Sequence, residues 1–490
     1  MAEISEEPEF TLRLVVDEEK KKVVLAEACR DFVDVLFSLL TLPMGTIVRL
    51  LERHRKSEIG CFRNLYTSVA EMGVDDFETQ ACKQILLNPT SVKEVECKRL
   101  KLNVNPTDDL KFFKCPYFSR CNLCTNFSGS VCSCGELMNQ EIQLSEEDQA
   151  AGSVQDDVGG VFVGGRSSFI ITDDLKVSVE STGLVLKTLH RLGCSDVSKL
   201  GEQLLDIGLR EILFLLECIF FSNTPLTDAL LRKEIPQDVN NMHKFLSPCV
   251  EVRTDVAEPE ITLEAIVSKQ DMKILYVECG EDFVNLLFTF LAVPLESVVE
   301  ISGNSSNFGC IGNLCKSFKV LSVDKGKQDS ASKCVLPYYY KCQKQFLDII
   351  TQDPPDYYRY RNSNPRQPDY SLTTDSYRTL LYRKDRLVFV SLIDPKSHGG
   401  DQSEEGSGFV KRGARFRVSD DLIITLSNSM STSLCFLKKL QFKADDLDVQ
   451  VVRIRNAEAM SLLTASLVTS SALNTALWNL IAKKPKEETL

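Results

Sequence analysis

One stretch of this chain occurs twice, and that repeat limits its possible folds more than any other feature. The first copy, at residues 23–50, reads VVLAEACRDFVDVLFSLLTLPMGTIVRL, and the second, at 274–301, reads ILYVECGEDFVNLLFTFLAVPLESVVEI. Matching residues recur in register without a gap, through the acidic, aromatic and proline positions alike. A long unit that occurs only twice indicates a tandem domain, because solenoids stack many short repeats.

Further blocks extend the match along both halves. The sequence GC-x-x-NL begins at Gly60 and again at Gly309, and the acidic pairs Asp173-Asp174 and Asp420-Asp421 follow similar β-branched runs. Each copy reads as strands, helices, a variable middle, strands and then helices. The pattern predicts an α+β fold made of two tandem strand–helix units.

The unit boundaries follow from this alignment and from local composition. We expect the first repeat unit at residues 10–232, with a cysteine-rich loop insertion at 112–138. A polar linker is expected at 233–258, followed by the second unit at 259–480, which contains a Tyr/Arg-rich variable loop at 337–386.

Charge and cysteine usage indicate a class of protein and a compartment. The net charge of −12 argues against a general nucleic-acid or anionic-membrane binder, because both partners demand a basic face. No apolar run has the length of a membrane span, and the acidic start lacks the features of a signal peptide. The 18 cysteines are expected as free thiols or metal ligands, which predicts a cytoplasmic or nuclear protein.

The most specific chemical signal is a group of five cysteines in the first unit: Cys115, Cys121, Cys124, Cys132 and Cys134. Closely spaced thiol pairs suit tetrahedral Zn²⁺, so the sequence predicts one structural zinc held by four of the five, with Cys115 or Cys121 left over. The alternative is a group of reduced thiols in a loop, since the gap of seven residues between the last two pairs is short for a zinc ribbon.

Other patterns have a structural explanation that we prefer. Adjacent carboxylates such as Asp173-Asp174 can serve acid–base chemistry, but a turn between two strands accounts for them. The glycine-bearing stretch at 160–167 resembles a phosphate loop with Arg166 in place of lysine, and a glycine turn explains it as well. No paired histidine motif or nucleophile elbow occurs among the 490 residues, so no catalytic set is predicted.

The segment at 337–386 departs from the acidic average. It contains nine of the twelve tyrosines together with several lysines and arginines. Interleaved rings and cations can bind single-stranded nucleic acid, but the proline and aspartate content favours a solvated or partner-binding loop.

Taken together, the blocks FVDVLFSLLTLP and FVNLLFTFLAVP, the two GC-x-x-NL motifs, Cys132-Ser133-Cys134-Gly135, FIITDDL, FRVSDDL and NTPLTDALL carry a resemblance. They resemble a plant family catalogued as domain of unknown function 674, over nearly the whole chain. The resemblance implies tandem copies in a plant protein and supplies no reaction.

These observations favour a non-enzymatic interaction or scaffold protein with a structural zinc site and an unknown protein partner. Two alternatives remain: an enzyme with a carboxylate-lined cleft between the two repeats, and an RNA binder that uses the Tyr/Arg-rich loop.

Overall fold

The computed structural model contains both sheets and helices, which confirms the α+β class. It describes residues 9–52, 59–107, 111–145, 160–165, 168–193, 197–234, 259–303, 308–322, 334–361, 370–374, 387–397, 408–427, 438 and 444–481.

The first half of the chain builds a five-stranded antiparallel sheet. Its strands lie in the order β10-β1-β2-β8-β9: β1 (Phe10–Asp17), β2 (Lys22–Ala28), β8 (Phe169–Thr172), β9 (Val177–Val179) and β10 (Leu200–Ile207). The hairpin expected near the start is β1 paired with β2. Every second residue of β1 from Phe10 to Val16 is buried, as the alternating pattern of a half-buried strand requires.

The second half builds a second five-stranded sheet with the same strand order. Its strands are β11 (Ile261–Ser268), β12 (Ile274–Cys279), β18 (Phe416–Ser419), β19 (Ile424–Leu426) and β20 (Leu447–Ile454). They lie in the order β20-β11-β12-β18-β19, so each half places its last strand beside its first. Phe10 pairs with Ile207 in one sheet, and Ile261 pairs with Ile454 in the other.

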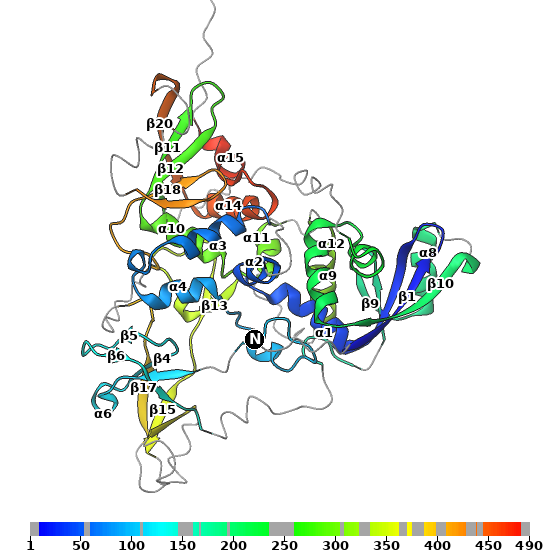
Figure 1. Ribbon diagram of the computed structural model, residues 1–490, viewed down its shortest axis with the longest axis horizontal. Helices are drawn as coiled ribbons and strands as arrows, with labels where there is room; N and C mark the ends of the chain where they lie inside the picture. The colour runs from blue at the N-terminus through cyan, green and yellow to red at the C-terminus, as the bar shows by residue number, and fades with distance from the viewer. Residues whose placement is uncertain are drawn as a thin grey trace, which may run out of the picture.

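Helices fill the space between the two sheets (Figure 1). Apolar residues at helical spacing and the stop at Pro43 account for two consecutive helices in the first copy, as expected. In chain order the helices are α1 (Arg30–Ser38), α2 (Met44–Glu52), α3 (Phe62–Glu71), α4 (Gln80–Leu87), α5 (Glu94–Cys97), α6 (Phe118–Cys121), α8 (Thr182–Arg191), α9 (Leu209–Phe221), α10 (Glu281–Phe290), α11 (Leu295–Ile301), α12 (Gly309–Leu321), α14 (Asn456–Val468) and α15 (Ala472–Leu477). Among these described helices, none is long and apolar enough to cross a membrane.

The two halves exchange one helix each. Helix α3 of the first half lies beside α10 and α14 of the second, and α12 of the second half lies beside α9 and β9 of the first (Figure 1). The Asn64 side-chain amide on α3 donates to the carbonyl oxygen of Asp421 at 2.8 Å. Asn313 on α12 donates in the same way to the carbonyl oxygen of Asp174, also at 2.8 Å. Each sheet is therefore completed by a helix from the other half.

The cysteine of each GC-x-x-NL motif also crosses between the halves. The Cys61 thiol donates to the carbonyl oxygen of Thr469 at 3.1 Å, and the Cys310 thiol donates to that of Ser222 at 3.5 Å. In both copies of the motif, the cysteine and the asparagine thus donate hydrogen bonds to backbone carbonyls of the other half. This shared role explains why the two residues recur together.

The halves also meet where Leu42-Pro43 and Val293-Pro294, which precede α2 and α11, lie side by side. Pro43 and Pro294 form an isolated antiparallel bridge, and the Met44 backbone amide donates to the carbonyl oxygen of Val293 at 3.0 Å. Backbone pairing at this point gives the junction a fixed register.

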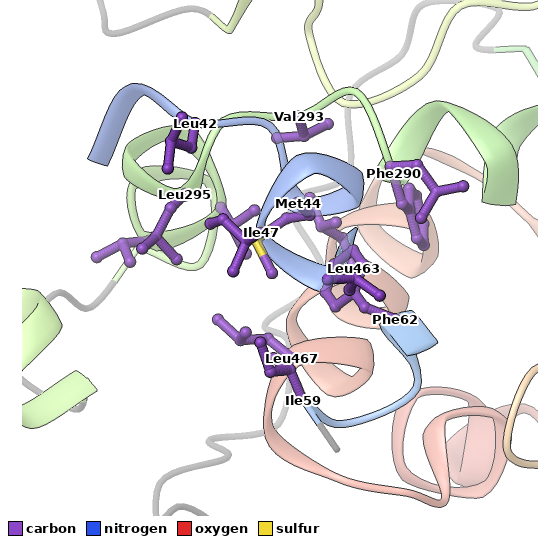
Figure 2. Packing of buried hydrophobic residues seen from close by; sticks show 14 of the residues in the cluster. Leu42, Met44, Ile47, Ile59, Phe62, Phe290, Val293, Leu295, Leu463 and Leu467 are labelled. Carbon is purple, nitrogen blue, oxygen red and sulfur yellow. The ribbon is translucent and has the colours of Figure 1, made fainter. Parts of the chain in front are cut away.

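Apolar side chains from both halves form one continuous core around this junction. Figure 2 shows Met44, Ile47 and Phe62 of the first half packed beside Leu463 and Leu467 on α14. The segment between the halves, residues 235–258, lies outside the described residues, and the boundaries at 10–232 and 259–480 stay predictions.

A third, six-stranded sheet combines the variable middles of both halves. Its strands run β16-β15-β17-β4-β3-β7, and β17 joins β4 in parallel. Three strands come from the first half, β3 (Phe112–Lys114), β4 (Leu123–Thr125) and β7 (Gln140–Ile142), and three from the second, β15 (Tyr357–Arg361), β16 (Tyr370–Thr373) and β17 (Val388–Leu392). Short two-stranded ladders complete the described strands: β5 (Ser130–Val131) with β6 (Leu137–Met138), and β13 (Val335–Pro337) with β14 (Ile350–Gln352).

This sheet corrects the prediction of a solvated loop at 337–386. Residues 357–361 and 370–373 are paired strands, while 362–369 and 375–386 lie outside the described residues. The cysteine-rich middle, also expected as a loop, contributes β3 and β4. The composition gave the wrong result because strand pairing distant in sequence decides these elements: β15 pairs with β16 and β17, and β17 pairs with β4 of the first half.

Candidate metal centre

Four cysteines come together at the edge of the six-stranded sheet, in the region of α6, β5 and β6 (Figure 1). The sulfur atoms of Cys115, Cys121, Cys132 and Cys134 all lie within 4.8 Å of one another. The Cys115 sulfur lies 3.8 Å from that of Cys121 and 3.4 Å from that of Cys134. In a tetrahedral site with Zn–S bonds of about 2.3 Å, neighbouring sulfurs are about 3.8 Å apart. The four thiols therefore have the spacing that a zinc ion requires.

Local structure places the first two of these thiols. Cys115 directly follows β3, and Cys121 is the last residue of α6. The next residue, Asn122, adopts a left-handed conformation with φ of 49°, which turns the chain from α6 into β4. Asparagine tolerates this region better than most side chains, so the sequence Cys121-Asn122 suits a helix end beside a metal ligand.

The other two thiols lie in a tight turn between β5 and β6. The Cys132 backbone amide donates to the carbonyl oxygen of Glu136 at 2.8 Å, and the Gly135 amide donates back to that of Cys132 at 2.8 Å. Gly135 has φ of 87°, a value open to glycine and strained for other residues. The Cys-Ser-Cys-Gly motif is thus a turn that points two thiols to one side.

Backbone amides also point at the sulfurs. The Tyr117 amide donates to the Cys115 sulfur at 3.3 Å. A hydrogen bond from the Glu136 amide, reinforced by the Cys115 thiol, lowers the pKa of Cys134 to about 7. Burial instead raises the pKa of Cys121 to about 11 and also raises the pKa of Cys115. Zinc would bind the deprotonated form of all four thiols and release their protons, because a thiolate is the metal ligand.

Cys124, the fifth candidate, lies outside the cluster. Its side chain is fully buried in a small apolar core with Phe112, Phe118 and Tyr357, and burial raises its pKa to about 12. The expectation that Cys115 or Cys121 would be the spare thiol is therefore wrong. Adjacent residues of a strand point to opposite faces, and Cys124 occupies the core-facing position of β4. Recognising Leu123–Thr125 as a strand would have placed Cys124 in the core and excluded it as a ligand.

Cys134 is exposed, whereas apolar side chains pack against the other three thiols, Cys115, Cys121 and Cys132. Met138 and Ile393 are buried against them, and Leu123 is packed alongside. Ile393 comes from the second half, and its backbone amide donates to the carbonyl oxygen of Cys124 at 2.9 Å. A zinc ion with four thiolates has no open coordination position, so such a site is structural.

The acidic pairs hold the fold together. Asp173 accepts hydrogen bonds from the backbone amide and the hydroxyl of Thr227 at 2.9 and 2.8 Å, and Asp420 accepts one from the Asn474 amide at 2.8 Å. Burial raises the pKa of Asp173, although these two donors oppose the effect. The turn interpretation is confirmed, because Asp173 lies between β8 and β9 and Asp420 lies between β18 and β19.

The glycine-bearing stretch and the histidines add no further site. The strand β8 begins soon after Gly165, whereas a phosphate loop requires a helix there. Residues 166–167 lie outside the described part of the chain, as do His54, His243 and His398. His190 is exposed on α8.

Comparison with known proteins identifies a family and no activity. The chain belongs to the family described as "Protein of unknown function (DUF674)", whose model matches residues 6–457. The resemblance seen in the sequence blocks is thereby confirmed, while the tandem copies remain our interpretation of the repeat. No curated protein and no solved structure matches the chain.

Proposed function

We propose that this plant-type chain is a non-enzymatic interaction or scaffold protein, and that Cys115, Cys121, Cys132 and Cys134 hold one structural zinc. The four-cysteine cluster beside the junction of β4 with β17 carries the proposal. At that junction the Ser391 amide donates to the carbonyl oxygen of Asn122 at 3.0 Å. Zinc would fix the first-half strands on which the second-half strands pair.

The small size of the local core indicates that this sheet needs an additional cross-link. The core of the six-stranded sheet contains seven buried residues, and β3, β4 and β7 each have three residues. Small cores of this kind supply little stability, and natural proteins add metals or disulfides to them. No disulfide joins any of the described cysteines, so metal binding is the cross-link that we propose for this region. Reduced thiols suit the cytoplasm or nucleus, where we place the protein.

The sheet face next to the metal site offers a surface for a protein partner. Tyr358 on β15 and Phe389 on β17 lie in an edge-to-face arrangement with ring centroids 5.9 Å apart. Phe389 is 51% exposed. Exposed aromatic pairs on a rigid strand supply large contact area at low entropic cost, which is typical of binding surfaces.

The test is the zinc content of the purified full chain under reducing conditions. We expect one zinc per chain, lost in Cys132→Ser together with a lower melting temperature. Cys124→Ala is the matched control, since it removes a cysteine outside the cluster and should retain the metal. Absence of zinc from the wild-type chain, or equal zinc in wild type and Cys132→Ser, would contradict the proposal.

RNA binding is a second candidate, favoured by the cations that lie over rings on the same sheet. The guanidinium of Arg359 lies 5.5 Å from the ring of Phe118 and 5.0 Å from that of Tyr370. Arg359 also donates to the side-chain oxygen of Asn122 at 2.9 Å, so part of its hydrogen-bonding capacity is used inside the protein. Salt-sensitive binding of a single-stranded oligonucleotide, weakened by Phe389→Ala, would favour this candidate over a protein partner.

The enzyme alternative has one residue pair in its favour. Glu296 of the second half and Lys93 of the first lie 3.3 Å apart, and burial raises the pKa of Glu296. A catalytic cleft also needs a cavity, and a cavity of about 320 Å³ in the first half is lined by residues of that half alone. We therefore consider the enzyme alternative less well supported than the scaffold function.

A further inference from the structure

A cavity of about 320 Å³ lies in the first half, away from the cysteine cluster. It is formed by the β1–β2 turn, the β8–β9 turn, the end of α8 and residues 223–224. Val23, Val24 and Leu192 supply apolar wall. Its volume is at the lower end of the range for ligand pockets, about 300–1,000 Å³, so it suits a small molecule.

Charged side chains line this cavity. Three carboxylates line it, and each has a lysine within ion-pairing distance: Asp17 with Lys20 at 3.2 Å, Asp173 with Lys22 at 3.8 Å, and Asp174 with Lys176 at 2.6 Å.

A fourth cation, Arg191, lines the same cavity from the last turn of α8. Within the described part of the chain, no carboxylate lies within 4.0 Å of its guanidinium group. Hydrogen bonds from Lys176 and Thr172 lower the pKa of Asp174, and the charge of Arg191 adds a smaller contribution in the same direction. The four lining cations still outnumber the three lining carboxylates by one. Arginine presents a planar fork of donors that matches a carboxylate in a bidentate fashion.

The second half shows that the fold does not require two of these cations, Lys20 and Lys176. Its β18–β19 turn has the same hydrogen bond as the β8–β9 turn: Ile423 donates to the Ser419 hydroxyl at 3.1 Å, as Lys176 donates to that of Thr172 at 3.1 Å. Isoleucine therefore takes the place of Lys176 in an equivalent turn.

The hairpin turns differ in the same way. Each has a left-handed residue, Lys21 with φ of 49° in the first half and Met272 with φ of 55° in the second. The residue just before it is Lys20 in the first half and Asp271 in the second. Asp173 and Asp174 recur as Asp420 and Asp421, whereas Ser268 takes the place of Asp17. Two of the four cations, Lys20 and Lys176, are specific to the first half.

We propose that this cavity binds a small organic monocarboxylate, with its carboxylate on Arg191 and its apolar body against Val23, Val24 and Leu192. One carboxylate neutralises the single excess charge of the lining, whereas a phosphate dianion would leave a net negative site. The proposal is independent of the zinc site and of the scaffold function.

The experiment uses the full chain and a matched pair of probes. Binding of benzoate and of its uncharged isostere benzamide is measured by titration calorimetry and by ligand-observed NMR, with inorganic phosphate as a third probe. We expect saturable binding of benzoate in the millimolar range or tighter, and binding of benzamide and phosphate at least about tenfold weaker.

Two variants connect that binding to the cavity. Arg191→Gln should weaken benzoate binding about tenfold or more, because it removes a charge-assisted hydrogen bond. Arg210→Gln, at an exposed arginine on α9 that does not line the cavity, should leave it unchanged. Both positions are exposed, so the melting temperature should stay constant. No saturable benzoate binding, preference for phosphate, or equal binding by the two variants would overturn the proposal.

Discussion

Asp34 provides a direct test of whether one buried carboxylate holds the segment before β8 against helix α1. Its side chain on α1 is 2% exposed and accepts three backbone hydrogen bonds, from Val161 at 2.8 Å and from Phe162 and Val163 at 2.9 Å. A single carboxylate thus holds the segment that leads into β8. Replacing Asp34 with alanine should release this segment from the helix.

The expected loss of folding free energy follows from the three backbone amides that Asp34→Ala leaves without an acceptor. A buried donor without a partner costs about 1–3 kcal/mol, and three such amides give about 3 kcal/mol at the lower limit. We use the lower limit because burial raises the pKa of Asp34, which shows that ionisation of the carboxyl has an opposing cost. Asparagine keeps one acceptor oxygen, so Asp34→Asn should cost about 1 kcal/mol.

The second half supports the milder effect of asparagine. There Asn285 takes the same role, and its side-chain oxygen accepts from Phe409 at 2.8 Å and from Val410 at 3.3 Å. An amide in this position is therefore compatible with the fold.

The assay combines thermal unfolding of the full chain with hydrogen exchange of the amides at 161–163. Asp34→Ala should lower the melting temperature and accelerate exchange at these amides, and Asp34→Asn should do both to a smaller degree. Asp31→Ala on the same helix is the control, because the side chain of Asp31 is 47% exposed and its ion pair contributes little. Equal effects of Asp34→Ala and Asp31→Ala, or of alanine and asparagine at position 34, would refute the reasoning.

Three further predictions concern the exchange, the backbone and the metal site. Cutting a protease site introduced within residues 235–258 should leave the two halves in one particle on size exclusion, because each sheet is completed by the other half's helix; separate elution would contradict the exchange. Gly60→Ala should destabilise the chain far more than Gly309→Ala. Both glycines have a positive φ, 48° at Gly60 and 51° at Gly309, but only at Gly60 would the new methyl group collide with the carbonyl oxygen of Ser466. Equal melting temperatures of the two variants would show that the collision is relieved. In metal-free chain the alkylation rate of Cys134 should rise with pH and level off above about pH 7, where its thiol is ionised, and zinc should suppress it; mass spectrometry of the modified peptide measures both effects.

Much of the local structure could be read from residue patterns. The helix α1 and the hairpin before it follow from apolar spacing and β-branched runs, and the turn role of Asp173-Asp174 follows from its position between two strands. The thiol pair Cys132-Ser133-Cys134 was recognisable as part of a thiol cluster, since a short spacing lets one turn direct both sulfurs. In each case the determining interactions lie within a few residues.

Long-range contacts decided what the patterns missed. The strand at Tyr357–Arg361 looked like a loop because its partners are β16 and β17, and β17 in turn pairs with a strand of the first half. Cys124 looked like a ligand because its spacing from Cys121 suits zinc, but its orientation depends on strand β4.

By itself the sequence determined the α+β class, the recurrence of the same short sequence blocks in both halves, and the group of thiols in the first half. Only the tertiary structure decided that α3 and α12 cross to the opposite sheets, that the variable middles share one sheet, and which four sulfurs converge. The physical reason is that local patterns encode which face of an element is apolar, whereas the element that covers this face is chosen by packing across the whole chain.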